Sequence, residues 1–340
     1  MRAFLIAFLS AAASLSLHAQ NVVVMTQNMD EGTNESYVLA FANSNLKLGV
    51  DLTLAEVVGS GVPERANALA ARIAAEKPDI VGLQEVGLWR FGLTPATANF
   101  VLYDQLQLLL NALKAHGVPY RAVTVNNLTD LALPATIGAV RLTDRDALLV
   151  RADSSAQVQN PQNHIFRAAF PFGSINIEAG WISADVQVGA KIFRLISTHL
   201  MSAIAGIQLA TDIQVNQTRE LIAALQGLPF PVVISGDLNS DANGGSGPDA
   251  TPSVALIKAD GYVDGWLLRN PGNPGTTWPL FLQDQTPPHF FAPAVPFERI
   301  DVFLSKGISM LSGKTVTAPA PGTLPGFGSD HAGVIAAFQP

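Results

Sequence analysis

Residues 232–240 read VVISGDLNS and join a short apolar run to a cluster of polar side chains. A continuous apolar run of this length, rich in β-branched residues, is typical of a strand buried on both faces. The run ends at Gly236, and Asp237 and Asn239 follow directly. Side chains that do chemistry are commonly carried at the ends of such rigid elements. The stretch therefore predicts a central strand that delivers Asp237 and Asn239 to a site.

Apolar runs of the same length recur along the chain, and most of them also end in polar residues. One further segment, Ser183–Val188, alternates apolar with polar residues, as a half-solvated strand does. The other predicted strands are Val22–Met25, Ile80–Leu83, Ala147–Val150, Ile192–Ser197, Ile300–Leu304 and Val334–Phe338.

Helical patterns lie between these runs. Pro63 suits a first helical position, and apolar residues follow it on one face as far as Ile73. A third helix is predicted over residues 207–225. Strands alternating with two or three helices predict one α/β domain over residues 20–340. The second predicted helix carries a stripe of leucines, Leu102, Leu106, Leu109 and Leu113.

The first residues do not resemble part of the fold. Arg2 precedes an apolar run from Ala3 to Leu17, and Ala19 offers a small residue for cleavage. This pattern predicts a secretory leader of residues 1–19 and a secreted or periplasmic protein. The alternative is a buried first helix, but the run has no polar face. It is short for a membrane span, which needs about 20 residues, and no later run is long enough, so we expect no membrane span.

The composition excludes several kinds of site. Without cysteine, the chain has neither disulfides nor thiolate nucleophiles or metal ligands. A Gly-x-Ser-x-Gly elbow and a His-Glu-x-x-His motif are both absent, which disfavours serine hydrolases and zinc proteases. The formal net charge of −7 disfavours a general polyanion binder, although a local basic patch is compatible with it.

Polar clusters at the strand ends carry the candidate chemistry. Each is a weak signal alone, since an aspartate after a strand is often a turn former or helix cap. The clusters are Gln27–Asp30, Gln84-Glu85, Thr198-His199, Gly236–Asn239, Arg299–Asp301 and Ser329–His331. Their order along the chain is more specific than any one cluster, and it resembles the endonuclease/exonuclease/phosphatase superfamily from about Val22 to Phe338.

The resemblance implies a fold and a metal site. The fold is a four-layered α/β sandwich, in which helices flank two packed, mainly antiparallel β-sheets. Glu85 matches the metal-binding glutamate of the family, and Asn28, Asp30 and Asp330 would complete the ligand shell. Such oxygen ligands suit Mg²⁺, with Mn²⁺ or Ca²⁺ as alternatives.

The resemblance also implies catalytic roles. His331 matches the histidine that contacts the scissile phosphate or activates water, and Asp301 would orient it. Asp237 and Asn239 match the pair that positions nucleophile and phosphate, with Asp237 as either the base or an orienting group. His199 matches the residue that contacts or protonates the leaving side.

Two residues stay open at this level. Asp146 precedes a predicted strand and either supports the site or forms a salt bridge with Arg145. His289 lies in an aromatic, proline-rich loop and either shapes the substrate entrance or packs.

The sequence thus predicts an exported, divalent-metal-dependent phosphoesterase, acting by activated water as a monomer. The favoured substrates are a phospholipid or a small organic phosphate ester, because the chain is acidic and has apolar loops such as Phe290–Pro293. A secreted nuclease that cleaves DNA or RNA is the alternative. A catalytically silent binding protein is a third interpretation, but no predicted site residue is missing.

Overall fold

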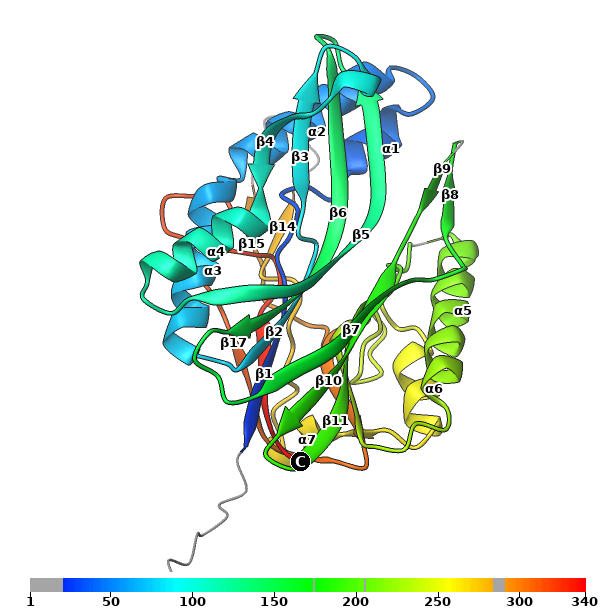
Figure 1. The fold of residues 1–340 in the computed structure, drawn as a ribbon. Coiled ribbons are helices and arrows are strands. Elements are labelled where there is room, and N and C mark those ends of the chain that lie inside the picture. The colour runs from blue at the N-terminus through cyan, green and yellow to red at the C-terminus, as the bar shows by residue number, and fades with distance from the viewer. Residues whose placement is uncertain (1–20, 174, 205, 284–290) are drawn as a thin grey trace, which may run out of the picture.

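The computed structural model describes residues 21–173, 175–204, 206–283 and 291–340 (Figure 1). The predicted leader and His289 lie outside these residues. The helices are α1 Ser36–Phe41, α2 Leu46–Gly59, α3 Val62–Glu76, the 3-10 helix η1 Pro95–Thr97, α4 Gln105–Ala115, α5 Gln208–Leu225, α6 Ser253–Ala259 and α7 Gly265–Arg269. The strands are β1 Val22–Asn28, β2 Ile80–Gln84, β3 Leu88–Gly92, β4 Phe100–Asp104, β5 Tyr120–Pro134, β6 Ala139–Arg151, β7 Gln157–Ile165, β8 Phe170–Phe172, β9 Ile175–Ile177, β10 Gly180–Val188, β11 Lys191–His199, β12 Val232–Asp237, β13 Val263–Asp264, β14 Phe281–Gln283, β15 Phe291–Pro293, β16 Asp301–Lys306, β17 Ser309–Val316 and β18 Gly333–Gln339.

Two large sheets form the centre of the molecule. The first has the order β17-β18-β1-β2-β6-β3-β4, with β5 also paired to β6, and the second has the order β13-β16-β12-β11-β10-β7. Within these sheets, β1 pairs with β2 and β11 with β12 in parallel, and the other pairs are antiparallel. The prediction of mainly antiparallel sheets is confirmed.

The continuous apolar runs are explained by burial on both faces of each sheet. Along β1, Val24 enters the core between the two sheets, while Met25 enters the core under the outer helices. Along β6, Leu148 and Leu149 divide in the same way. At about 25 cal/mol for each Å² of apolar surface buried, these strands contribute much of the stabilisation of the fold.

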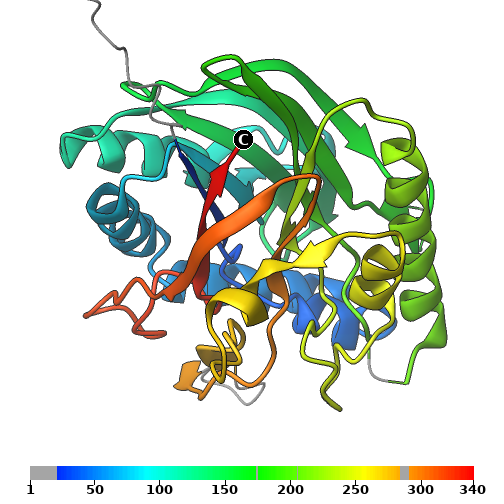
Figure 2. The same ribbon diagram turned by 90° about the horizontal axis from the view of Figure 1, so that it is seen from below.

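Helices cover both outer faces. Leu69 of α3 and Leu109 of α4 pack on the first sheet, and Leu221 of α5 and Ile257 of α6 pack on the second. Figure 2 shows the resulting order of helices, sheet, sheet and helices. The predicted four-layered sandwich is confirmed. No helix in the described ranges is long and apolar enough to cross a membrane.

One helix prediction was partly wrong. The leucine stripe was expected to begin at Leu102, but this residue lies in β4, which pairs with β3. Helix α4 begins only at Gln105, because Asp104 caps it by accepting a hydrogen bond from the Gln107 backbone N–H at 3.3 Å. The later leucines are buried as predicted.

The strand register brings the predicted site residues together. On three adjacent strands of the second sheet, Asp237 lies directly between His199 and Asp301. The two sheets approach each other closely between β2 and β11. A Cβ on Gly82 of β2 would lie only 2.4 Å from the hydroxyl oxygen of Ser197 in β11. A glycine in β2 thus lets the ends of the two sheets share one site.

Candidate active site

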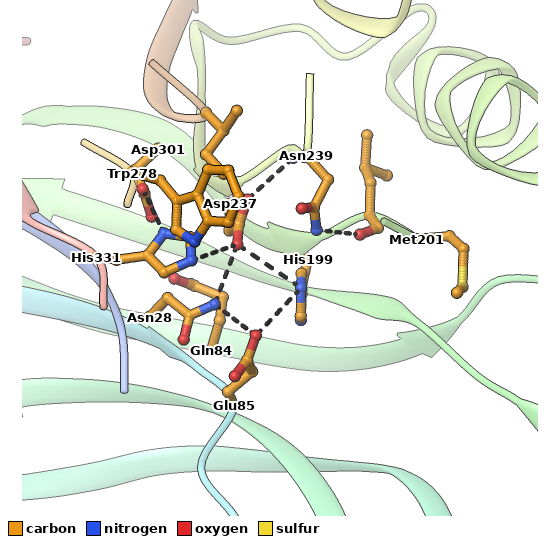
Figure 3. Close-up of polar contacts among 12 residues, drawn as sticks. Asn28, Gln84, Glu85, His199, Met201, Asp237, Asn239, Trp278, Asp301 and His331 are labelled. Atoms are coloured by element: carbon orange, nitrogen blue, oxygen red, sulfur yellow. Dashed lines mark hydrogen bonds and ion pairs between the residues drawn. The ribbon is translucent and has the colours of Figure 1, made fainter. Parts of the chain in front are cut away.

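A cavity of about 470 Å³ opens at these strand ends. Of the predicted site residues, Asn28 and Asp301 lie behind its wall, and the others line it, namely Asp30, Glu85, His199, Asp237, Asn239, Asp330 and His331. Figure 3 shows how most of these side chains converge from both sheets.

His331 and Asp301 form a buried pair. The imidazole Nδ1 lies 2.8 Å from Asp301 Oδ2, and its Nε2 faces Asp237 Oδ2 at 3.7 Å and Asp330 Oδ1 at 3.8 Å. Burial alone would lower the pKa of His331, but Asp301, Asp330 and Asp237 outweigh it and raise that pKa well above its usual value. The three carboxylates around the ring thus favour its protonated form, and Nε2 lies on the side of Asp237 and Asp330.

Asp237 stands between two imidazoles. Its Oδ2 lies 3.7 Å from His331 Nε2 and 3.8 Å from His199 Nε2, and its Oδ1 accepts the Asn239 backbone N–H at 2.9 Å. The preceding Gly236 has φ +142°, and a Cβ there would lie 1.8 Å from the Thr198 carbonyl oxygen. Glycine is therefore required for this strand end to place Asp237 beside His199.

His199 ends β11 on the other side of Asp237. Its Nε2 also lies 4.0 Å from Glu85 Oε1. Burial would lower the pKa of His199, but Asp237 and Glu85 outweigh it and raise that pKa. Next to it, Asn239 has φ +44° and donates its side-chain amide to the Leu200 carbonyl at 2.9 Å.

Asn28 connects the predicted metal ligand Glu85 to the carboxylate of Asp237. Its side-chain amide donates to Glu85 Oε1 at 2.7 Å and to Asp237 Oδ2 at 3.0 Å, while its Oδ1 accepts the Asp30 backbone N–H at 2.8 Å. The Asp30 N–H requires an acceptor, which fixes the orientation of the amide. Asn28 therefore acts as a donor that holds two carboxylates, and its role as a metal ligand stays a prediction.

Asp30 is held by a cation of the protein. Its Oδ2 lies 2.9 Å from the guanidinium of Arg65, which also donates to the Met29 and Asp30 carbonyls at 2.9 Å. Burial raises the pKa of Asp30, and Arg65 opposes the rise. Since this carboxylate already has a partner, a metal ion would have to share it with Arg65.

Asp330 faces the cavity beside His331. Its Oδ2 accepts the Trp278 indole N–H at 3.1 Å, and no Lys or Arg of the described residues pairs with it. Burial raises the pKa of Asp330 to about 7, and Asp30 and Glu85 add to the rise while His331 opposes it. Three carboxylates thus gather here, and the described residues place no Lys or Arg beside Asp330.

The donor set fits a divalent metal ion. Ligand atoms of Glu85, His199 and Asp237 lie within 4.8 Å of one another, and so do those of Asp237, Asp301 and His331. Carboxylate oxygens are the ligands that Mg²⁺, Mn²⁺ and Ca²⁺ prefer. The crowding of carboxylates around Glu85 and Asp330 is the charge arrangement that a bound cation would relieve.

Among the described residues, Asp146 forms no ion pair with its neighbour Arg145. Arg145 forms an ion pair with Asp104 at 2.7 Å. Asp146 is fully buried, and neither carboxylate oxygen has a hydrogen-bond partner among the described residues. Burial raises the pKa of Asp146 well above its usual value. The largest opposing influence is the charge of His199, which lowers that pKa. The carboxylate thus lies within the electrostatic reach of His199.

Sequence reasoning missed a second group of acids on the cavity wall. Glu31 and Glu35 come from the loop after β1, and Asp144 comes from β6. Burial is the largest cause that raises the pKa of Glu31 well above its usual value, that of Glu35 to about 7 and that of Asp144 to about 6, and the charge of Glu85 adds to each rise. The only sequence feature that could have indicated this group is that Glu31 directly follows the predicted site residue Asp30.

Comparisons with solved structures agree with this fold. An endonuclease/exonuclease/phosphatase family protein from Leptotrichia buccalis is 14% identical, with a TM-score of 0.58 over 94% of this chain and 100% of that chain. D. rerio TDP2, solved with a single-strand DNA product, is 15% identical (TM-score 0.53; 94% and 99% covered). A mannosyl-6-phosphatase from Bacteroides thetaiotaomicron is 13% identical (TM-score 0.54; 93% and 99% covered).

At these identities the solved structures support the fold alone, and no curated protein matches the sequence. A family model does match, over residues 42–331, and it describes the Endonuclease/Exonuclease/phosphatase family, whose members hydrolyse phosphoester bonds. With the four-layered fold and with acids and histidines gathered at the strand ends, the chain belongs to the Endonuclease/Exonuclease/phosphatase family.

Proposed function

We propose that this chain is an exported, divalent-metal-dependent phosphodiesterase that hydrolyses a phospholipid or a small organic phosphate ester with an activated water molecule. The observation that carries the proposal is the position of Asp237, whose Oδ2 lies within 3.8 Å of the imidazoles of both His199 and His331. In this arrangement the carboxylate can accept a proton from an attacking water, while the imidazoles on either side can donate hydrogen bonds to a phosphoryl group.

The charge of the cavity favours a small ester over nucleic acid. The described residues that line it include no Lys or Arg, whereas proteins that track a phosphate backbone normally present such side chains. A single phosphoryl group needs only the two histidines and a bound cation. The acids of the lining are Asp30, Glu31, Glu35, Glu85, Asp144, Glu178, Asp237, Asp249 and Asp330.

An apolar wall of the same cavity supports a substrate with a hydrocarbon part. Leu131 and Leu133 of β5 line it together with Val140 and Leu142 of β6. Apolar surface of this kind binds the carbon portion of a ligand, while a few polar groups fix its orientation. A phospholipid or an alkyl phosphodiester has both parts.

Glu85 and Asp330 are the two predicted carboxylate ligands without an Arg or Lys partner in the described residues, and they would hold the metal ion. A divalent cation at this position supplies positive charge to a phosphoryl oxygen. Asn28 keeps Glu85 in place through its amide.

The protein groups then divide the proton transfers. Asp237 accepts a proton from the attacking water, since its Oδ2 faces the cavity between the histidines. His331, charged and oriented by Asp301, donates a hydrogen bond to a phosphoryl oxygen and stabilises its growing negative charge. His199, whose raised pKa favours the imidazolium, donates its proton to the leaving oxygen.

A substrate panel tests the proposal. Purified protein with Mg²⁺ is assayed on sphingomyelin, phosphatidyl lipids, small alkyl phosphodiesters, inositol phosphates, single-stranded DNA and plasmid DNA. We expect the highest kcat/KM on a phospholipid or small diester. Turnover of DNA with no turnover of the lipids or small esters would replace the proposal by the nuclease alternative.

Export and domain organisation belong to the same proposal. We propose that residues 1–19 are removed on secretion and that residues 20–340 form one catalytic domain. Intact-mass measurement of protein from the native host should show the leader missing to within one or two residues. Cytoplasmic protein that retains Met1 would contradict it.

A further inference from the structure

Helix α5 buries two glutamines on the face that packs on the second sheet. Gln214 and Gln217 are both 0% exposed, whereas other buried positions of this helix, such as Ile213 and Leu221, are apolar. Burying an amide is unfavourable unless its hydrogen bonds are made, and a leucine would fill the same space without that requirement. The partners of the two amides therefore indicate what they do.

The side chain of Gln214 joins two loops of the cavity wall. Its Nε2 donates to the Met201 carbonyl at 2.8 Å and to the Asn239 carbonyl at 2.6 Å. Its Oε1 accepts the hydroxyl of Ser253 at 2.8 Å. Because two carbonyls require the amide nitrogen, these partners fix the orientation of the amide, and both of its hydrogens are used. Gln214 thus ties the loop after β11 to the loop after β12.

Gln217 holds the same loop from its other side. Its Oε1 accepts the Met201 backbone N–H at 2.9 Å, and its Nε2 donates to the Ala168 carbonyl at 2.8 Å. Gln214 and Gln217 are three residues apart and therefore lie on one face of the helix. One turn of α5 thus holds both the N–H and the carbonyl of Met201.

This loop begins at His199, the last residue of β11, where the hydrogen bonds of the sheet end. The backbone N–H of Leu200 donates to the Asp237 carbonyl at 3.1 Å, and its carbonyl accepts the Asn239 side-chain amide at 2.9 Å (Figure 3). All four backbone polar groups of Leu200 and Met201 are thus bonded, although neither residue belongs to a helix or a strand. These bonds fix the backbone that carries the imidazole of His199.

We infer that Gln214 and Gln217 are positioning residues for His199, and that their hold on Met201 keeps the imidazole aligned with the leaving oxygen of the phosphoester. This inference rests on the proposed function, in which His199 Nε2 gives its proton to that oxygen as the bond between phosphorus and oxygen breaks. It adds that two side chains of α5, neither of which lines the cavity, control this proton transfer.

The dependence of the rate on the leaving group separates positioning from a general loss of structure. Two esters are compared in Mg²⁺, namely the best phosphodiester of the substrate panel and its analogue in which 4-nitrophenol replaces the leaving alcohol. The 4-nitrophenolate anion leaves without a proton, whereas an alkoxide has to be protonated. Misalignment of His199 therefore slows the first ester and spares the second.

Gln214→Leu keeps the size of the side chain and removes both donors. We expect it to lower kcat by about 10²-fold on the alkyl ester, since a displacement of about 1 Å can cost this much, and by less than about threefold on the nitrophenyl ester. KM should change little on either ester. Gln217→Leu should show the same pattern, and it tests the inference if Gln214→Leu does not fold.

Leu221→Ala is the matched control, because it is a buried change in the same helix at a residue outside the cavity lining. It lowers stability as well, but it should leave the ratio of the two rates at the wild-type value. His199→Ala is the reference for a selective loss on the alkyl ester.

The outcomes are distinguishable. Equal losses on the two esters in the glutamine variants, or wild-type rates on both, would overturn the inference. If His199→Ala is selective and neither glutamine variant is, the proposed function stands and the inference fails. Equal losses in His199→Ala would remove this residue as the acid, and the inference with it. No turnover of any ester in the substrate panel would overturn the inference and the proposed function together.

Discussion

Both ring nitrogens of His331 face carboxylates, which fixes the orientation of the imidazole. Its Nδ1 is held by Asp301 at 2.8 Å, and its Nε2 is directed toward Asp237 and Asp330. We predict that His331→Ala lowers kcat/KM by about 10²-fold or more, the range for a general acid–base group. The exposed His116 provides the matched control, and His116→Ala should keep the wild-type kcat/KM. Wild-type kcat/KM in folded His331→Ala protein would remove the residue from the mechanism.

Asp301 Oδ2 lies 2.8 Å from His331 Nδ1, and we predict that Asp301 acts through this ring. Asp301→Asn removes the charge that helps to raise the pKa of the imidazole, so the ring loses its proton at a lower pH. We expect a smaller loss of kcat/KM than for His331→Ala, and a loss that grows as the pH rises. The double variant should be little worse than His331→Ala alone, because residues that act as a unit are not additive. Multiplied losses in the double variant would contradict the pairing.

At the residue scale, the sequence predicted site residues at the ends of buried strands, and their proximity can be compared with the structure. Asp237, His199 and Asp301 were predicted as site residues, and the structure places them side by side. Glu31 and Glu35 were not predicted as residues of the cavity. They lie in a loop, and nothing in their spacing shows that this loop reaches the cavity wall. The sequence also did not show that Arg65 is the partner of Asp30, because Arg65 lies on a separate helix far along the chain.

At the level of elements, α3 fixes two loops of the site through one side chain. Arg65 is 1% exposed and bonds the Met29, Asp30 and Gly328 carbonyls in addition to the Asp30 carboxylate. It thus ties the loop after β1 to the loop that carries Asp330 and His331.

We predict that Arg65→Met lowers the free energy of unfolding by about 3–5 kcal/mol, because it leaves Asp30 buried without its cation. Catalytic activity should fall as well, since both loops lose their shared anchor. The exposed Arg219 is the matched control, and Arg219→Met should change stability by less than about 0.5 kcal/mol. Chemical denaturation measures both, and equal effects of the two substitutions would contradict the anchoring role.

The elements differ in how well the sequence predicts them. Strands such as β1, β2 and β12 are buried on both faces and leave continuous apolar runs. Strand β7 is mostly exposed, contains Pro161 and, among the described strands, pairs only with β10, so it leaves no periodic signal. Strand β5 is half-buried and its register is interrupted by bulges, which break the alternation that would identify it.

At the scale of the whole molecule, buried acids make stability depend on pH. The pKa is raised to about 7 for Glu56, Asp249 and Asp330, in each case chiefly by burial. The unfolded chain then loses these protons near pH 4 and the folded protein only near pH 7. Stability is therefore present below about pH 4 and lost as the pH rises through about 7, by about 1.4 kcal/mol per group for each pKa unit.

We predict that metal-free protein is less stable at pH 8 than at pH 5 in chemical denaturation. Glu56→Gln should reduce this difference, because the neutral amide has no proton to lose. The exposed Glu64→Gln should keep it. A wild-type protein that becomes more stable from pH 5 to pH 8 would show that these acids are not protonated in the metal-free fold.

A bound metal ion would neutralise this same concentration of carboxylates. The most direct test of the account is therefore to remove the metal ion and to measure the rate of hydrolysis. The initial rate of hydrolysis of the best phosphodiester is followed in wild-type protein as purified, after exhaustive chelation, and after Mg²⁺ is added back. We predict that chelation reduces the rate to background, and that Mg²⁺ restores it and raises Tm by mass action. Full turnover after exhaustive chelation would contradict a metal-dependent phosphodiesterase.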